Sequence, residues 1–435
     1  MNWKEHYQTR IITADEAIKL LKKGDIVVSG HATGEPQLLP EALVRNQEKV
    51  DGIVVYHGIA LGPSVYCGKD VDPKHIEHLT IFAGTNTRQA VQEGRARFVP
   101  MHFSDSPIAL RKGIIPADVA WLHLSPPDKH GYCSMGISCD YQRAGAERAR
   151  LVVAEINPNM PRTYGDTLIH VTEIDYFVES DRPLIEMKKA EVGPLEMAIG
   201  KNISELLEDG STMQFGMGAI PNAIVGFLKN KNDLGIHSEL FPDGAMELIM
   251  AGNVTNKYKK VHTGKSVCTF ASGTGELYKW LDQNPAVEFY PVDYINNSYL
   301  IAQNDKVFSV NSALQVDLQG QVCAETINAK QYSGIGGQMD FVRGATWSKG
   351  GKSIIAMSAT AKNGQISRIV STFKPGDAVT TPRNDVDYVV TEYGAAHLRG
   401  VDMAERARRL IAIAAPQFRD QLMDELVQVY GLTCN

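Results

Sequence analysis

The sequence predicts an α/β protein built from two similar open α/β domains. Its 435 residues are two to three times the length of a typical domain. Segments with helical periodicity alternate with short runs rich in β-branched residues, which is typical of a largely parallel sheet covered by helices. A pattern in the first half also recurs in the second half about 186 residues later, the separation of Leu20 and Leu206.

The repeat rests on three pairs of segments that occur in the same order. The pairs are 20–30 with 206–216, 128–133 with 317–322, and 165–178 with 376–390. The third pair is displaced further because the second half carries extra residues. We therefore predict two copies of one α/β unit, with domains at 1–188 and 189–435 and a linker over 180–194.

Residue types along the chain predict individual elements. An apolar helical pattern over 14–21 predicts a helix, which precedes predicted strands over 26–28 (IVV) and 53–56 (IVVY). In the second half, a helical pattern over 203–207 has the corresponding place. Apolar residues recur with helical spacing over 404–430, with arginines between them, and predict helices that close the second domain.

The charge balance bears on the partners of the protein. Lys and Arg number 44 against 50 Asp and Glu, so the net charge of −6 provides no long-range attraction for nucleic acid. Residues 1–6 (MNWKEH) lack the features of a signal peptide, and no apolar run approaches the roughly 18 residues of a membrane span. We expect a cytoplasmic protein with no nucleic-acid or membrane partner, in which local groups hold any anionic ligand.

The cysteines carry no recognisable pattern. They are scattered without a Cys-x-x-Cys pair, as Cys67, Cys133, Cys139, Cys268, Cys323 and Cys434. This predicts reduced, buried thiols, with neither a disulfide framework nor a metal site.

Two glycine-rich segments are candidates for ligand binding. The first, 216–221 (GMGAIP), follows a predicted strand and opens a helix, an arrangement that presents backbone N–H groups to an anion or a polarised carbonyl. It lacks the last glycine of a dinucleotide fingerprint, so we do not predict NAD binding. The second segment is 333–345, and Lys362 follows it on a predicted turn, within reach of a phosphate. Structural turns and a solvated surface lysine are the alternatives.

A carboxylate follows the first glycine segment. Residues 235–244 (GIHSELFPDG) read as a short apolar strand, a polar trio and a turn, which places Glu239 at the carboxyl edge of a strand. Ligands of open α/β sheets bind at that edge, although most such glutamates are only solvated. We interpret His237, two residues earlier, as an ordinary hydrogen-bonding histidine.

Four longer motifs together resemble one protein family. Residues 214–221, 234–239, 333–345 and 387–394 look like the acetyl-CoA hydrolase/transferase family of class I CoA-transferases. Within the family they look closest to the 4-hydroxybutyrate CoA-transferases, with the butyryl-CoA:acetate CoA-transferases as near neighbours. The resemblance covers essentially the whole chain. It implies a duplicated NagB/RpiA/CoA-transferase-like fold with the active site at the interface of the two domains. It also implies a homodimer or homotetramer with no tightly bound cofactor, and coenzyme A as a substrate.

The same resemblance implies a role for individual residues. Glu239 falls where the family carries CoA as a γ-glutamyl thioester. Asn296 falls on the oxyanion-stabilising asparagine, although Asn297 and Ser298 stand where His-Pro is usual, and the Gly337 amide shares that role. The implied CoA-binding positions are Phe215, Gly216, Met217, Gly218, Ala219, Leu314, Ser333, Gly337 and Lys362.

The acid substrate needs a pocket as well. His31 and Glu35 lie in the first-half loop that repeats the Gly216 loop, and we predict that they line this pocket opposite Glu239, together with Gln214.

The implied reaction moves CoA between a short-chain acyl-CoA, such as 4-hydroxybutyryl-CoA or butyryl-CoA, and acetate. A carboxylate nucleophile suits it, because each intermediate remains an activated acyl species. Two alternatives stay open. One is an acyl-CoA hydrolase that uses the same Glu239, and the other is a non-catalytic CoA-binding or sugar-phosphate-binding sensor.

Overall fold

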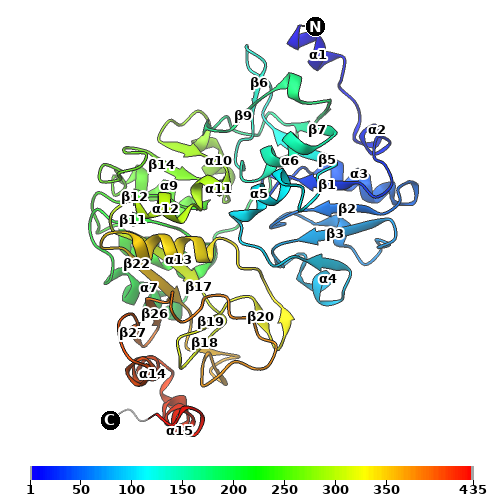
Figure 1. The fold of residues 1–435 in the computed structure, drawn as a ribbon. Coiled ribbons are helices and arrows are strands. Elements are labelled where there is room, and N and C mark those ends of the chain that lie inside the picture. The colour runs from blue at the N-terminus through cyan, green and yellow to red at the C-terminus, as the bar shows by residue number, and fades with distance from the viewer. Residues whose placement is uncertain (1, 433–435) are drawn as a thin grey trace. The chain divides into compact units, whose positions relative to one another are not determined.

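The computed structural model describes residues 2–432, which form two compact units (Figure 1). Unit 1 contains the chain up to Lys188 with Glu239–Asp243 and Val267–Ile295, and unit 2 contains Lys189–Ser238, Gly244–Ser266 and residues 296–432. The first change of unit falls after Lys188, and two later segments return to unit 1. The continuous domains 1–188 and 189–435 remain a proposal about the sequence repeat.

Unit 1 is built on a seven-stranded sheet whose neighbouring strands are all parallel. In spatial order the strands are β10 (Tyr176–Glu179), β7 (Leu151–Ile156), β5 (Val119–Leu124), β1 (Ile26–Ser29), β2 (Ile53–Tyr56), β3 (Ile76–Thr80) and β4 (Ala96–Phe98). Every residue of β5 and β7 is buried, as expected for strands covered on both faces. The strands predicted at 26–28 and 53–56 are confirmed as β1 and β2.

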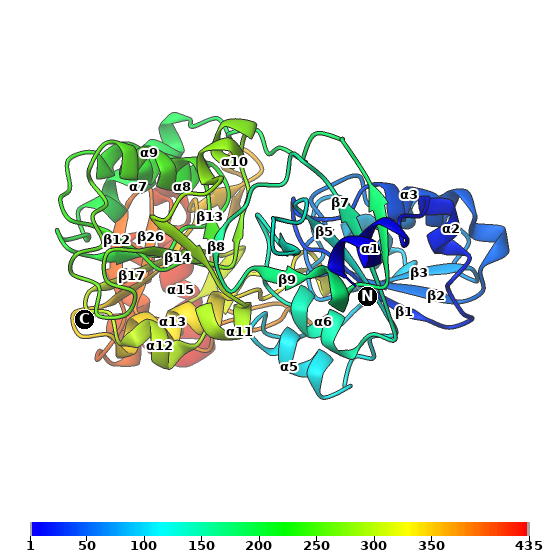
Figure 2. The same cartoon turned by 90° about the horizontal axis from the view of Figure 1, so that it is seen from above.

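Helices pack on both faces of this sheet. The helices in unit 1 are α1 (Trp3–Gln8), α2 (Ala14–Ile18), α3 (Leu38–Arg45), α4 (Arg88–Gln92), α5 (Asp105–Arg111), α6 (Gln142–Arg148), α10 (Gly275–Leu281) and α11 (Val292–Ile295). Val27 belongs to a buried cluster with Leu39 of α3, whereas Val28, the next residue, belongs to a cluster with Leu110 of α5. Successive strand residues therefore face different helices, and Figure 2 shows α3 and α5 on opposite sides of the sheet.

Unit 2 contains a six-stranded sheet that is parallel except for its last strand. In spatial order the strands are β12 (Gly235–Ile236), β11 (Thr212–Met213), β17 (Val307–Ser312), β22 (Lys352–Ala356), β26 (Tyr388–Thr391) and β27 (Gly394–His397). The remaining α-helices of the described chain are α7 (Pro194–Ser204), α8 (Ala219–Leu228), α9 (Asp243–Met250), α12 (Ser298–Ala302), α13 (Gln338–Trp347), α14 (Met403–Ala412) and α15 (Arg419–Tyr430).

Short strands complete the fold. They are β6 (Tyr132–Ser134), β8 (Tyr164–Gly165), β9 (Leu168–His170), β13 (Leu240–Phe241), β14 (Ser266–Cys268), β15 (Phe270–Ala271), β16 (Val287–Phe289), β18 (Gln315–Asp317), β19 (Val322–Cys323), β20 (Thr326–Ile327), β21 (Lys330–Gln331), β23 (Thr360–Ala361), β24 (Ile366–Ser367) and β25 (Ile369–Val370).

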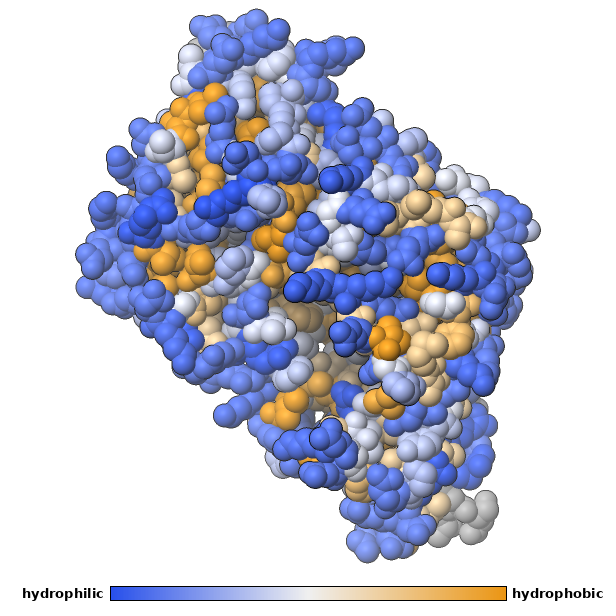
Figure 3. All heavy atoms as spheres, turned by 180° about the vertical axis from the view of Figure 1, so that it is seen from behind, coloured by the Kyte–Doolittle hydropathy of each residue, from blue (hydrophilic) through white to orange (hydrophobic). Residues whose placement is uncertain are grey.

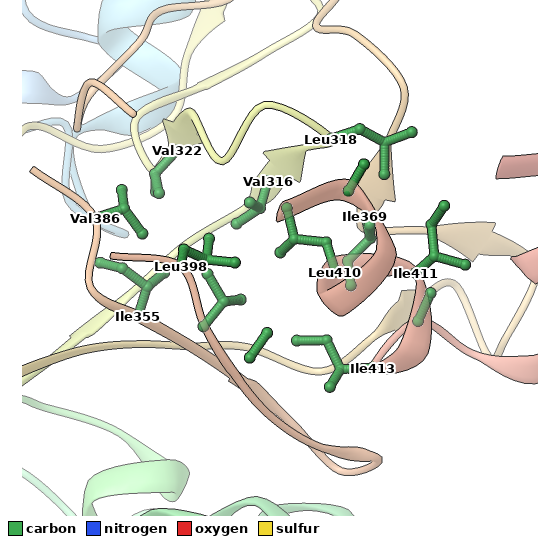
Figure 4. Packing of buried hydrophobic residues seen from close by; sticks show 14 of the residues in the cluster. Val316, Leu318, Val322, Ile355, Ile369, Val386, Leu398, Leu410, Ile411 and Ile413 are labelled. Carbon is green, nitrogen blue, oxygen red and sulfur yellow. The ribbon is translucent and has the colours of Figure 1, made fainter. Parts of the chain in front are cut away.

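The helices predicted over 404–430 are confirmed as α14 and α15. Leu410 and Ile411 of α14 lie in a buried cluster with Val316 of β18 and with Leu318, which directly follows β18 (Figure 4). The C-terminal helices therefore pack against the core of unit 2.

Two other predicted helices differ in extent from the structure. The helix predicted over 14–21 ends at Ile18, because the residues after it form tighter turns before the strand. The helix predicted over 203–207 lies earlier, as α7 (Pro194–Ser204). Proline suits the first turn of a helix, so Pro194 begins this helix although the prediction assigned it to the linker.

Matching hydrogen bonds in the two units support the duplication. Oδ1 of Asp128 accepts bonds from the backbone N–H groups two and four residues later, and Oδ1 of Asp317 accepts the same pair in unit 2. Oδ2 of Asp175 accepts a bond from the second residue of the neighbouring strand β7, and Asp387 makes the equivalent bond to β22. The aligned aspartates thus perform the same structural role in each copy.

The sequence analysis expected neither a membrane partner nor a metal site, and the surface and side chains of the described residues concern both expectations. Polar residues cover most of the face in Figure 3, where apolar residues form separate patches. Among residues 2–432, no helix is long and apolar enough to span a membrane, and no group of three or more His, Cys, Asp or Glu is placed to hold a metal ion.

The cysteines that the structure describes are free thiols, four of them buried and Cys67 half-buried. Burial raises the pKa of the Cys67 and Cys133 thiols to about 12, which keeps them protonated at neutral pH. Met1 and Cys434 lie outside the described residues.

Candidate active site

The loop between β11 and α8 contains five of the predicted CoA-binding residues, 215–219. It follows the strand at which the order of the unit 2 sheet reverses, with β12 on one side of β11 and β17 on the other. Ligands of open α/β sheets bind at such a reversal. Gly218 has a φ of 120°, which L side chains rarely adopt, and directly precedes α8. The N–H groups in the first turn of this ten-residue helix, which have no partner within the helix, therefore lie at the end of the loop.

Exposure differs along this loop. Phe215 is buried, whereas Met217 and Gly218 are exposed. The side chain of Gln214 joins the start of the loop to β17, because its Oε1 accepts from Val310 N at 2.9 Å and its Nε2 donates to Phe215 O at 3.0 Å. Gln214, predicted for the acid pocket, therefore has both ends of its amide in structural hydrogen bonds.

A serine attaches the next strand to the same loop. Ser238 is fully buried, and its Oγ accepts from Phe215 N at 2.9 Å and donates to Phe215 O at 3.3 Å. The buried ring of His237 lies edge-on to Phe341, with Nδ1 3.5 Å from Nδ2 of Asn304. Residues 237–238 are thus held in unit 2 immediately before Glu239.

Glu239 is the first residue of a short segment that packs with unit 1. It is half-buried and lies between β12 and β13. The short strand predicted before Glu239 is confirmed as β12. Its carbonyl oxygen accepts hydrogen bonds from Thr269 N at 3.0 Å and Phe270 N at 3.1 Å. These bonds position the backbone of Glu239 beside β15.

His31 lies close to the same strand within unit 1. The His31 ring is fully buried, with its centroid 5.1 Å from that of Phe270 and 4.8 Å from that of Phe103. Its Nδ1 is 3.2 Å from Oδ2 of Asp140. The structure therefore brings the predicted His31 near the strand that hydrogen-bonds the backbone of Glu239.

Asp140 is a buried carboxylate that the sequence analysis did not identify. Burial disfavours its charge, but His31, a 2.5 Å hydrogen bond from Ser138 and the Tyr141 N–H together hold its pKa below the ordinary value. The carboxylate is therefore ionised at neutral pH and orients the His31 imidazole.

Glu35 lies in a different environment from Asp140. It is 5 % exposed, and burial raises the pKa of its carboxyl group to about 8, against a hydrogen bond from the Gly62 backbone. Oε2 of Glu35 is 3.4 Å from Nε2 of His57, and burial also lowers the pKa of His57 well below its usual range. Both side chains are therefore uncharged at pH 7. The second ring nitrogen of His57 is 2.6 Å from the Tyr66 hydroxyl.

In unit 2 the two predicted oxyanion donors are held close to one helix. Asn296 is 1 % exposed, and its Nδ2 donates to Oδ2 of Asp340 at 3.3 Å. Gly337 is the N-cap of α13, three residues before Asp340. Asn297 instead caps α12, because its Oδ1 accepts from Tyr299 N and Leu300 N.

The other predicted CoA-binding residues are distributed over the β-rich part of unit 2. Leu314 is half-buried and donates from its amide to Cys323 O at 2.8 Å, and Ser333 Oγ donates to Ala324 O at 2.8 Å. Lys362 is exposed in the turn between β23 and β24, with a φ of 48°. The sequence interpretation of Lys362 as a turn residue is confirmed.

Several polar residues that the prediction did not single out contact its candidates. Ser238 and Asp340 lie inside the quoted motifs, but residue type alone does not distinguish them from other polar loop residues. Asp140 and His57 are far along the chain from their partners, and only a comparison of related sequences offers a signal for them.

Comparisons with known proteins agree with this architecture. The acetyl-CoA hydrolase/transferase N-terminal domain profile matches residues 1–187, and the C-terminal domain profile matches residues 273–426. A 4-hydroxybutyrate coenzyme A transferase of Clostridium kluyveri is 51 % identical over 98 % of this chain and 99 % of its own length. A butyryl-CoA:acetate CoA-transferase of Anaerostipes caccae is 36 % identical over 98 % of this chain and 97 % of its own.

Solved structures show the same likeness. RipA from Yersinia pestis superposes with a TM-score of 0.93 at 38 % identity, covering 99 % of this chain and 100 % of RipA. A 4-hydroxybutyrate CoA-transferase from Porphyromonas gingivalis has a TM-score of 0.83 at 40 % identity, covering 98 % of this chain and all of that one. The two matching domain profiles and the near-complete coverage of these relatives show that the chain belongs to the acetyl-CoA hydrolase/transferase family.

Proposed function

We propose that this protein is a CoA-transferase that moves CoA between 4-hydroxybutyryl-CoA or butyryl-CoA and acetate. The observation that carries the proposal is 51 % identity over 98 % of the chain to a 4-hydroxybutyrate coenzyme A transferase. The 36 % identical butyryl-CoA:acetate CoA-transferase supports the choice of a short-chain acyl group and acetate.

The proposed nucleophile is the carboxylate of Glu239. It attacks the acyl-CoA carbonyl, so that a C–O bond forms, the C–S bond breaks and CoA leaves as a thiolate. The thiolate then attacks the γ-carbonyl of Glu239, which releases the first acid as a carboxylate and leaves CoA on Glu239 as a thioester. An incoming acetate reverses these steps, and no net proton is taken up or released.

The first step is energetically uphill. A carboxylate with an ordinary pKa of about 4.3 displaces a thiolate whose thiol has an ordinary pKa of about 8.5. Donors aimed at the developing oxyanion are each worth about 10²–10³ in rate, and we assign this role to Asn296 and the Gly337 amide. Binding energy from the remote parts of CoA supplies the rest, through residues 215–219, Leu314, Ser333, Gly337 and Lys362.

His31 and Glu35 are proposed to line the pocket for the acid, with Gln214. A neutral Glu35 carboxyl group does not repel an incoming carboxylate, and it also offers a hydrogen bond to a hydroxyl group on the acyl chain. The burial that raises the pKa of Glu35 therefore suits a pocket that receives anions.

Covalent trapping tests the proposed reaction. The protein is incubated with butyryl-CoA, reduced with borohydride, digested and analysed by mass spectrometry. We expect reduction at Glu239 in the native chain and in Glu276→Ala, an exposed glutamate in the first turn of α10. Glu239→Ala should show neither reduction nor transfer. Turnover without any reduction product at Glu239 would show that the covalent mechanism is wrong.

The same preparation separates transfer from hydrolysis. We expect CoA to leave butyryl-CoA at a rate that depends on added acetate, with acetyl-CoA as the product. Release of free CoA at the same rate without acetate would favour a hydrolase. Sedimentation of the same sample tests the proposed homodimer or homotetramer.

A further inference from the structure

A carboxylate is paired with the amide that the proposed reaction uses as an oxyanion donor. Nδ2 of Asn296 lies 3.3 Å from Oδ2 of Asp340, and the Asn296 side chain is almost completely buried. The two residues are 44 positions apart in the sequence, so folding of unit 2 creates the pair.

The segment that carries Asn296 is attached to α13 at two further points. Ser298 Oγ donates to the carbonyl oxygen of Asp340 at 2.8 Å. A Cβ added to Gly344 of α13 would lie 2.5 Å from Cγ2 of Ile301, so α12 packs directly against the backbone of α13. These contacts hold α13 against residues 298–301.

The position of Asp340 in its helix suits a carboxylate. It lies in the first turn of α13, three residues after the N-cap Gly337, where free N–H groups and the helix dipole favour negative charge. The same helix start carries the Gly337 amide. One short segment thus fixes both groups that are assigned to the oxyanion.

The chemistry of an asparagine amide gives the pair a function. The amide can present either its oxygen or its NH₂ group, and only the NH₂ group stabilises an oxyanion. A carboxylate accepts hydrogen bonds and does not donate them, so Asp340 requires that Nδ2, rather than Oδ1, faces it. An NH₂ group carries two N–H bonds, so donation to Asp340 engages one of them and fixes the direction of the other.

We propose that Asp340 is a positioning residue for the transfer reaction. Its carboxylate holds the Asn296 amide in the orientation that offers an N–H to the oxyanion formed when Glu239 attacks the acyl carbonyl. This inference rests on the function proposed above. It predicts that Asp340 acts through Asn296 and contributes little to the binding of CoA.

A double-mutant cycle tests this assignment. kcat and KM for butyryl-CoA are measured for the native chain, Asp340→Ala, Asn296→Ala and the double variant. We expect Asp340→Ala to lower kcat by about tenfold to a hundredfold, with KM changed by less than about threefold, because loss of one oxyanion donor costs about 10²–10³. In the Asn296→Ala background the same substitution should lower kcat by no more than about twofold.

Two further variants separate positioning from a structural role. Asp340→Asn keeps an acceptor oxygen, and we expect it to restore most of the kcat that Asp340→Ala loses. Asp420→Ala removes a first-turn carboxylate from α15, and it should leave kcat and KM unchanged.

Two results would overturn the inference. One is an equal loss of kcat from Asp340→Ala with and without Asn296, and the other is native kcat in Asp340→Ala. If the Glu239 thioester still forms in these variants, the inference alone has failed. If Glu239→Ala retains transfer, the proposed function itself is wrong.

Discussion

The hydroxyl of Ser238 is hydrogen-bonded to both backbone polar groups of Phe215, at 2.9 Å to the nitrogen and 3.3 Å to the oxygen. Ser238 directly precedes Glu239, and Phe215 begins the glycine loop. A single buried side chain therefore couples the residue directly before the proposed nucleophile to the proposed CoA-binding loop.

Substitution of Ser238 should lower the stability of the fold and raise KM for butyryl-CoA. In Ser238→Ala the buried Phe215 N–H loses its acceptor, and an unsatisfied buried group costs about 1–3 kcal/mol. We expect the free energy of unfolding to fall by about that amount in urea titrations, and KM for butyryl-CoA to rise. Ser309→Ala is a matched control, because Ser309 is also buried and its hydroxyl has no hydrogen-bond partner. Equal effects of the two substitutions would contradict the coupling.

The raised pKa of Glu35 makes stability depend on pH. Its carboxyl group has a pKa of about 8 in the folded chain and an ordinary value of 4.5. Between these values the folded state binds more protons than the unfolded state, so this group lowers stability as pH rises, by about 1.4 kcal/mol per pH unit.

Urea titrations across pH 5–9 check this dependence. In Glu35→Gln the fall in stability with rising pH that Glu35 causes should be absent. The free energy of unfolding of this variant, relative to that of the native chain, should therefore increase with pH up to about pH 8. Glu48→Gln, at an exposed position, should follow the native curve. A constant difference between Glu35→Gln and the native chain would show that Glu35 is ionised in the folded state.

Gly62 provides the space that Glu35 occupies. A Cβ at position 62 would overlap Oε1 of Glu35 and lie 2.6 Å from Cδ1 of Ile185. Gly62→Ala should therefore displace the Glu35 carboxyl group and destabilise the fold by about 1–3 kcal/mol.

Gly226→Ala, inside α8, is the opposite case, because no atom lies within 4 Å of the added Cβ. Alanine there should stabilise the helix by about 0.5–1 kcal/mol in thermal or urea unfolding.

His31 should affect turnover more than CoA binding. Its imidazole is oriented by Asp140 and lies against Phe270, whose N–H bonds the backbone of Glu239. We expect His31→Ala to lower kcat by about tenfold or more while CoA binding, measured by calorimetry, stays near the native value. His31→Gln, which keeps a donor toward Asp140, separates orientation from loss of fold. His130→Ala, at an exposed position, is the control. Native kinetics in His31→Ala would show that His31 does not line the acid pocket.

The repeat and its turns were predictable from residue type and spacing. Asp128 and Asp317 form the same turn in each unit because a short acidic side chain, with glycine three residues later, accepts hydrogen bonds from nearby backbone N–H groups. The boundaries of the helix at 14–21 and of α7 were less predictable, because helical periodicity continues past the residues whose hydrogen bonds end a helix.

The family motifs were also sufficient to identify Glu239, Asn296 and the glycine loop as candidates. Local backbone preference and hydrophobic periodicity act over a few residues, so linear order carries that information. The pairing of Asn296 with Asp340, of His31 with Asp140 and of Glu35 with His57 joins residues that are distant in the chain. The charges of Glu35, His57 and Asp140 depend on burial and on neighbouring groups, which come together only after the strands and helices have packed.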